Sequence, residues 1–274
     1  MGREVRNHDK FSKTISDIKL DEIWMDAQKF KIQQKQNEWF TFLNEICKLG
    51  DPVDIIIEIG SYDGGSTVSL SHITKELITI DMAVTPRFDE FGYPEGSQVK
   101  GSAYIRQKCK FLMTQPNSHN VTTLEEVKQI LNGRKVDVLF IDGDNTQQGV
   151  KQDFNLYSEF VKEGGLIGVH NILKSEFHTQ HGCFIHDFWD EIKSKFDGVE
   201  IIDDFAIEKT NDEWGGIGII KVTKELLETV EASNNQPTID NNSFIQPGAN
   251  TNTVVQSNGG SMLDNASYMG GINY

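Results

Sequence analysis

The feature that most constrains this chain is a regular alternation of short apolar runs with helix-like stretches between residues 51 and 222. Short apolar runs bounded by Gly, Asn and Asp are typical of strands buried on both faces, as in a parallel sheet covered by helices. We predict strands at Ile55–Ile59, Leu77–Ile80, Lys110–Met113, Val136–Ile141, Leu166–Val169, near Val199–Ile202, and at Ile217–Lys221. The last two follow one another without a crossover helix, which predicts an antiparallel closing hairpin. The expected fold class is a doubly wound, Rossmann-like α/β sheet that is mostly parallel.

Composition divides the chain of 274 residues into three parts. Residues 1–50 are polar, with apolar side chains such as Trp39 and Ile46 at helical spacing, and we expect an N-terminal helical extension. Residues 51–230 are expected to form the α/β domain. Residues 231–274 are rich in Asn, Ser and Gly and are expected to be a disordered tail. Folding of that tail on a partner or on a neighbouring subunit is the alternative.

Charge and cysteine content narrow the class of function. The formal net charge of −15 opposes binding of nucleic acid, whose recognition rests on Lys and Arg. There is no apolar run of the length, about 18 residues, that a membrane span needs, and no apolar signal segment near residue 1. The three cysteines stand far apart without a CxxC pair, which fits a reducing compartment. We therefore expect a cytoplasmic protein with a small substrate, no nucleic-acid partner and no membrane, and leave a homo-oligomer open.

The strongest local signal is the strand Ile55–Ile59 followed by a glycine-rich turn and a helix beginning near Ser66. Glycines let the backbone approach a ligand closely, and a helix start offers free N–H groups. A dinucleotide fingerprint needs a second glycine where this chain has Tyr62, which makes NAD the weaker interpretation. Asp81 closes the next strand about twenty residues later, where an acid can accept ribose hydroxyls. The alternative for these residues is a plain tight turn and a helix cap.

The spacing Glu58-x-Gly60-x-x-x-Gly64 resembles the E-x-G-x-x-x-G motif of class I methyltransferases. In that family the glycine loop contacts the methionine part of S-adenosylmethionine. For the adenine, the loop after Met113 supplies our candidates. The full set expected to bind the cofactor is Glu58, Gly60, Ser61, Tyr62, Gly64, Ser66, Asp81, Asn117, Ser118 and Asp142.

Two neighbouring strands of the predicted sheet end in polar side chains. Asp142 and Asp144 follow the strand Val136–Ile141, and His170 with Asn171 follows the next one. Carboxyl ends of parallel strands meet at one edge, so these side chains are expected to converge, and their oxygen-rich set suits Mg²⁺. The alternative is a polar strand end that caps the next helix.

The order of motifs across roughly residues 50 to 222 is similar to the methyltransferase domain 24 group, related to cephalosporin-hydroxylase-like, rhamnosyl and macrocin O-methyltransferases. The motifs are Asn117-Ser118-His119, Leu139-Phe-Ile-Asp142-Gly-Asp144, Gly149-Val-Lys151-Gln-Asp153-Phe, Gly164-Gly165 and His170-Asn171-Ile172. Two residues depart from the group: Asn145 replaces a usual histidine and Asn171 a usual aspartate. More distant catechol- and caffeoyl-CoA-type enzymes place an Asp-Asn pair here as metal ligands, which implies that Asn171 can ligate through its amide oxygen.

The resemblance implies a methyltransferase that transfers a methyl group to a hydroxyl of a small molecule or sugar. It implies Mg²⁺ held by Asp142, Asp144, His170 and Asn171, which lowers the pKa of the hydroxyl. His170 or His119 then accepts the proton. Two alternatives remain open: a cofactor-binding or assembly module that has lost the chemistry, favoured by Asn145 and Asn171, and a nicotinamide-dependent oxidoreductase or sugar epimerase.

Two further segments carry weaker expectations. The Gly- and Pro-rich insertion Thr85–Tyr104 is longer than most connections, which predicts a lid in which Arg87 or Tyr93 touches the substrate. Three histidines follow the strand that ends at His170, and we interpret them as loop residues: His178, His181 and His186.

Overall fold

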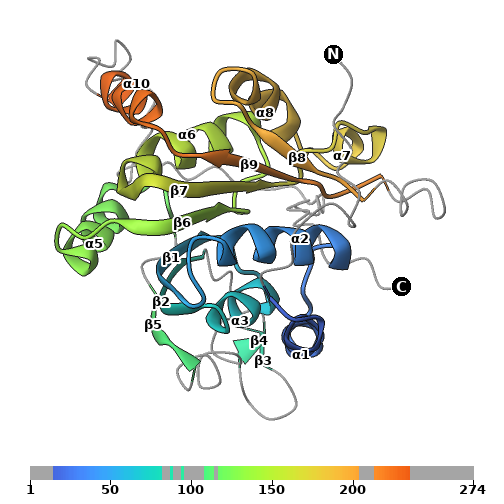
Figure 1. Ribbon diagram of the computed structural model, residues 1–274. Coiled ribbons are helices and arrows are strands. Elements are labelled where there is room, and N and C mark those ends of the chain that lie inside the picture. The colour runs from blue at the N-terminus through green and yellow to red at the C-terminus, as the bar shows by residue number, and fades with distance from the viewer. Residues whose placement is uncertain are drawn as a thin grey trace, which may run out of the picture. The chain divides into compact units, whose positions relative to one another are not determined.

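The computed structural model describes residues 15–81, 87–88, 94–95, 108–113, 117–203 and 213–234. Within them, seven strands form one sheet in the order β5-β2-β1-β6-β7-β9-β8, and a short antiparallel pair, β3 with β4, lies apart from it (Figure 1). The strands are β1 Val53–Ile59, β2 Thr74–Ile80, β3 Arg87–Phe88, β4 Pro94–Glu95, β5 Lys110–Met113, β6 Val136–Ile141, β7 Val161–His170, β8 Val199–Ile201 and β9 Ile217–Lys221. The order reverses between β1 and β6, where doubly wound sheets bind their ligands.

The pairing pattern confirms the predicted fold class. The strands β5, β2, β1, β6 and β7 are parallel to one another. β9 runs antiparallel to both of its neighbours, β7 and β8, so the predicted closing hairpin is present. The sheet therefore presents the carboxyl ends of β1, β2, β6 and β7 along a single edge.

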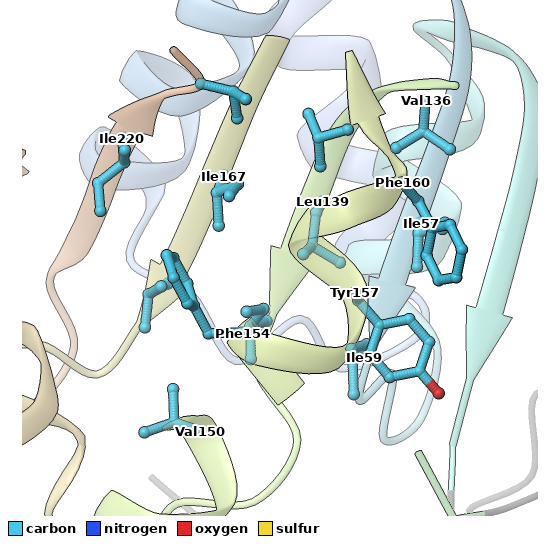
Figure 2. Close-up of a cluster of buried hydrophobic side chains, with 14 of the residues drawn as sticks. Ile57, Ile59, Val136, Leu139, Val150, Phe154, Tyr157, Phe160, Ile167 and Ile220 are labelled. Atoms are coloured by element: carbon cyan, nitrogen blue, oxygen red, sulfur yellow. The ribbon is translucent and has the colours of Figure 1, made fainter. Parts of the chain in front are cut away.

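Helices cover both faces of this sheet (Figure 1). One face carries α5 Val121–Leu131, α6 Gln147–Tyr157, α8 Ile185–Lys193 and α10 Lys224–Asn234; the other carries α1 Asp17–Gln28, α2 Gln36–Cys47 and α3 Gly65–Ser71. The short α7 Glu176–Gln180 and a 3-10 turn at Ser158–Phe160 complete the helical elements. Alternate strand side chains enter the two layers: Ile57 lies beside Phe160 and Ile59 beside Tyr157, as Figure 2 shows, and Ile56 lies in the opposite cluster.

The N-terminal helices share the core of the sheet. The rings of Trp39 and Phe42 of α2 pack on Phe140 of β6, with centroids 5.3 and 5.2 Å away. A Cβ on Gly168 of β7 would lie 2.6 Å from the Phe42 ring, so that glycine makes room for α2. The Trp39 indole N–H also donates to the Ser69 hydroxyl of α3 at 2.6 Å. α2 therefore fixes the position of the chain that precedes it.

Several predicted helix boundaries differ from the structure. Thr122 and Glu125 have the spacing of a capping box, which predicts a helix that begins there, but this prediction is wrong because α5 begins after Asn120 without a side-chain cap. The sequence also predicts a helix from about Val150 to Val161, whereas α6 begins earlier, at Gln147, where the Thr146 hydroxyl accepts from the Gly149 N–H at 3.0 Å. The helices α1, α7 and α10 were not predicted individually.

Some predictions fall outside the described residues. The tail was predicted to begin at residue 231, but α10 continues to Asn234, and the rest of the predicted tail lies outside the described residues. Apart from the short β3 and β4, the predicted lid also lies outside them. In the part of the chain that is described, no helix is both long and apolar enough to cross a membrane.

Candidate functional site

A carboxylate at the end of β2 holds the loop that follows β1. Oδ2 of Asp81 accepts hydrogen bonds from the Ser61 N–H at 2.6 Å, the Ser61 hydroxyl at 3.0 Å and the Tyr62 N–H at 2.9 Å. The two predicted elements of the site therefore lie in direct contact. These bonds occupy one oxygen of the carboxylate and fix the orientation of the other.

The loop has an unusual backbone. Gly60 and Gly64 have φ of 84° and 95°, and Tyr62 between them has φ of 49°. A bulky residue in this left-handed region is strained by roughly 1 kcal/mol or more. The Tyr62 side chain is 43% exposed. Tyr62, which stands where a dinucleotide fingerprint has its second glycine, thus adopts a glycine-like conformation and places its ring at the surface of the loop.

Two glycines of the loop allow close approach of other backbone segments. A Cβ on Gly60 would lie 2.1 Å from the Asp142 carbonyl oxygen, so the β1 and β6 loops meet backbone to backbone. A Cβ on Gly65 would lie 2.4 Å from Cα of Ile32, in the connection between α1 and α2. No pattern in the sequence indicates this second contact, which brings the segment from Lys31 to Gln34 onto the loop.

Glu58 lies beneath the loop. Its side chain is fully buried and accepts hydrogen bonds from the hydroxyls of Ser66 at 2.5 Å, Thr67 at 2.6 Å and Thr79 at 3.2 Å. Burial raises the pKa of the Glu58 carboxyl to about 8, against the effect of these donors. In this arrangement Glu58 and Ser66 join the end of β1 to the start of α3 and support the loop from inside.

A small cavity of about 30 Å³ lies beside the loop. It is lined by the β1 loop, by the β6 end and by the connection between α1 and α2: Lys31, Ile32, Gln33, Gln34, Gly60, Ser61, Tyr62, Gly65, Ser66 and Asp142. That volume holds little more than a single group of the size of a water molecule. The Lys31 ammonium pairs with Asp63 at 3.0 Å.

Asp142 and His170 meet at the tips of β6 and β7, as predicted. Nδ1 of His170 lies 3.0 Å from Oδ1 of Asp142, and since a carboxylate only accepts, Nδ1 carries the proton. The second oxygen of Asp142 accepts from Nε2 of Gln34 at 2.7 Å. His170 is 2% exposed, and its Nε2 has no hydrogen-bond partner among the described residues. Gln34 was missed because it lies in a polar stretch far from both strands in sequence.

Other ionisable groups surround His170. Burial lowers the pKa of the ring, but the Asp142 carboxylate and, more weakly, Glu38 outweigh this effect, so the pKa of His170 lies above its ordinary value. Glu38 of α2 is itself buried and accepts from the N–H groups of Asp203 and Gly216, both at 2.9 Å. The Trp214 ring stands edge-on to His170 at 6.4 Å.

His119 belongs to a separate pair. Its Nε2 lies 3.2 Å from Oδ1 of Asp153, a fully buried carboxylate of α6. The nearby Asp153 carboxylate raises the pKa of His119. The adenine candidates are in the same stretch: Asn117 Oδ1 accepts from the His119 N–H at 2.9 Å, and the Ser118 carbonyl accepts from the Tyr157 hydroxyl at 2.7 Å. The structure thus assigns the two candidate bases different carboxylates.

The predicted metal ligands do not form a metal site in this arrangement. No group of three or more His, Cys, Asp and Glu side chains within the described ranges is placed to hold a metal ion. Both oxygens of Asp142 are engaged by His170 and Gln34, and Oδ1 of Asp144 accepts from the Thr146 N–H at 2.8 Å.

The two residues that depart from the resembling group contact each other. Nδ2 of Asn171 donates to Oδ1 of Asn145 at 3.2 Å. Asn171 has φ of 61°, a conformation that Asn tolerates better than most residues. The chain thus joins the β6 and β7 ends by a neutral amide pair at the positions where the resembling group usually has histidine and aspartate.

The histidines after β7 differ from the loop residues that we expected. His178 is 2% exposed; its Nδ1 lies 2.6 Å from the Leu173 carbonyl, and its Nε2 accepts from the Gly215 N–H at 3.2 Å. Burial lowers the pKa of His178 to about 4. His186 is also buried, whereas His181 is exposed. Neutral His178 therefore links the chain at Leu173, just after β7, to the chain at Gly215, just before β9.

We expect His178 to make the fold sensitive to acid. Its folded pKa is lower than the unfolded value of about 6.5, so the unfolded state binds the proton first and stability falls below pH 6.5. At pH 5 the loss from this residue is about 2 kcal/mol. Urea unfolding at pH 7 and pH 5 measures it: His178→Asn should show a smaller decrease than the wild type. His181→Asn, the exposed control, should keep the wild-type decrease, and an unchanged decrease in His178→Asn contradicts the prediction.

Comparison with known proteins matches the central part of the chain to a family. Residues 57–172 match a family model described as a methyltransferase domain, so the resemblance to methyltransferases is confirmed over that segment. The match begins within β1 and ends just after β7, and it includes the glycine loop, Asp81, Asp142 and His170. Gln34 and Glu38 lie outside it.

Individual relatives are distant. An uncharacterized protein of Acanthamoeba polyphaga mimivirus is 31% identical over 124 residues, which cover 40% of this chain. The chain spans about half of that relative, 48% of its length. An O-methyltransferase from Bacillus cereus in complex with SAH is similar in structure with a TM-score of 0.45 and 15% identity, covering 76% of this chain and 92% of that one. The O-methyltransferase TomG from Streptomyces achromogenes gives a TM-score of 0.44 and 14% identity, over 76% and 91%.

Proposed function

We propose that this chain transfers the methyl group of S-adenosylmethionine to a hydroxyl group of a small molecule or sugar. The observation that carries the proposal is the contact of the glycine loop with Asp81, within a segment that matches a methyltransferase domain. A loop held in this way at the ends of two adjacent parallel strands is where doubly wound folds receive a nucleoside.

The residues present fit this cofactor chemically. The acceptor-lined cavity beside Gly60 suits the charged amino-acid end, and the oriented carboxylate of Asp81 suits the ribose hydroxyls. Glu58 and Ser66 keep the loop in place, and Tyr62 lies exposed on it. Asn117 and Ser118 are our candidates for the adenine. When bound, S-adenosylmethionine supplies an electrophilic methyl group on its sulfonium.

In this proposal His170 is the general base that accepts the proton of the acceptor hydroxyl. Asp142 holds Nδ1 in its protonated form, which leaves the lone pair of Nε2 for the proton of the acceptor hydroxyl. Since Nε2 is buried without a partner in the described part of the chain, a hydroxyl there would satisfy it. The raised pKa of His170 makes the ring a stronger base but leaves less of it neutral at neutral pH. His119, the second candidate, is engaged with Asp153 instead.

Calorimetric titration tests the cofactor. We expect the purified protein to bind S-adenosylmethionine with micromolar affinity, and Asp81→Ala to weaken this binding at least about tenfold, because the loop loses three hydrogen bonds and the ribose loses its acceptor. Asp54→Ala is the matched control, since Asp54 is exposed at the opposite end of β1 and pairs with Lys75.

Titrations with NAD⁺, and with Mg²⁺ added to each ligand, complete the test. Binding of NAD⁺ in place of S-adenosylmethionine, or of neither, would contradict the proposal and favour the oxidoreductase or the binding module. Affinity that depends on Mg²⁺ would favour a metal bound by the predicted ligands Asp142, Asp144, His170 and Asn171.

A further inference from the structure

Gln34 lines the cavity beside the glycine loop and has a buried polar atom that its own contacts do not satisfy. This side chain is 5% exposed, and its Oε1 is buried without a hydrogen-bond partner among the described residues. The orientation of the amide is fixed by its other end, because only Nε2 can donate to the Asp142 carboxylate. A buried carbonyl oxygen without a donor is unfavourable, so a group that supplies one is bound with a gain.

The surroundings of Gln34 define the chemistry of that group. Gln34 and Asp142 both line the small cavity, next to Gly60 and Ser61 of the loop. Amide and carboxylate oxygens in a site of water-molecule size favour a compact cationic donor. Lys31 also lines the cavity, and its ammonium pairs with Asp63 at 3.0 Å. An alkylammonium group has both the size and the charge that the cavity accepts.

We propose that Gln34 binds the α-ammonium group of S-adenosylmethionine, with Oε1 accepting one of its protons while Nε2 keeps Asp142 in place. This inference rests on the proposed function and extends it, since Gln34 lies outside the segment that matches a methyltransferase domain. The connection between α1 and α2 thereby contributes a binding residue to a site whose other parts come from the sheet. Its position is set by Ile32, whose backbone packs on Gly65.

Ligands that differ only at the amino-acid end distinguish the contact between Gln34 and the ammonium group from a general disturbance of the cofactor site. S-adenosylhomocysteine carries both the ammonium and the carboxylate. Its decarboxylated analogue, an adenosine with an aminopropylthio chain, keeps only the ammonium. Methylthioadenosine has neither group. We expect Gln34→Ala and Gln34→Met to weaken the first two about ten- to a hundredfold and to leave methylthioadenosine unchanged, because a hydrogen bond to a charged group is lost.

Calorimetry with all three ligands gives the readout, and thermal unfolding checks each variant. Gln34→Met preserves the length of the side chain, so it serves if the alanine variant is unstable. Gln36→Ala is the matched control, an exposed glutamine at the first position of α2. Equal weakening of all three ligands, or no weakening, overturns the role of Gln34 while the proposed function stands. If the wild type binds S-adenosylhomocysteine and S-adenosylmethionine not at all, both proposals fail together.

Discussion

Replacing Gly60 by alanine is expected to lower the free energy of unfolding by more than about 3 kcal/mol and to abolish measurable binding of S-adenosylmethionine. The new Cβ would lie 2.1 Å from the Asp142 carbonyl oxygen and 2.8 Å from Cα of Gly143. Neither is a flexible side chain, and the Asp142 N–H is bonded to the Ile59 carbonyl at 2.8 Å, so the backbone must separate. The loop and the β6 end would then lose their common geometry.

The Gly64→Ala variant separates the effect of the close contact at Gly60 from the effect of backbone strain. Gly64 has φ of 95°, but a Cβ there would meet no atom within 4 Å. In Gly64→Ala, the free energy of unfolding should fall only by the strain of an alanine in the left-handed region, about 1 to 2 kcal/mol. Urea unfolding of both variants, followed by titration with the cofactor, measures the difference. Equal losses in the two variants would show that the β1 and β6 loops do not touch at Gly60.

Asp142→Asn is expected to reverse the direction in which the pKa of His170 is shifted. Burial is the largest influence and lowers that pKa, and the Asp142 charge is the main influence that raises it. Asparagine can still accept from Nδ1, and the Gln34 amide can turn to keep a bond to it, so the fold should persist. Without the charge, the pKa of His170 should fall from above its ordinary value to below it.

Titration of the His170 ring proton by NMR measures this change. Asp144→Asn is the control, because Asp144 bonds to the Thr146 N–H and not to His170. A pKa of His170 that stays high in Asp142→Asn would mean that another carboxylate, such as Glu38, dominates. In the proposed reaction the same substitution should slow methyl transfer by about a hundredfold or more, since the base loses strength and orientation.

The sheet was predictable from the sequence because its strands are short, apolar and buried on both faces. Lys110–Met113, Val136–Ile141 and Ile217–Lys221 have the bounds that we predicted. β7 is longer than predicted, because Val161–Gly165 is in the strand although glycines usually end elements. The start of α5 was misplaced because Thr122 and Glu125 match a local pattern that the packing does not use.

Local patterns also identified the contacts that lie at neighbouring strand ends. Asp81 meets the glycine loop, and Asp142 meets His170, because parallel strands bring their carboxyl ends to one edge. Gln34, Glu38 and the Gly65–Ile32 contact were not predictable in this way. They depend on how α2 packs across the sheet through Trp39, and no sequence spacing encodes that tertiary contact.

The amide pair of Asn145 and Asn171 affects how this edge of the sheet responds to pH. A histidine and an aspartate at these positions would change their mutual attraction as the histidine lost its proton. Two amides do not titrate, so the β6 and β7 ends stay joined by the same bond in acid and in base. His170 contacts Asp142 at the same two strand ends through a separate bond, so the charge on the His170 ring can change while the amide pair keeps the β6 and β7 ends together.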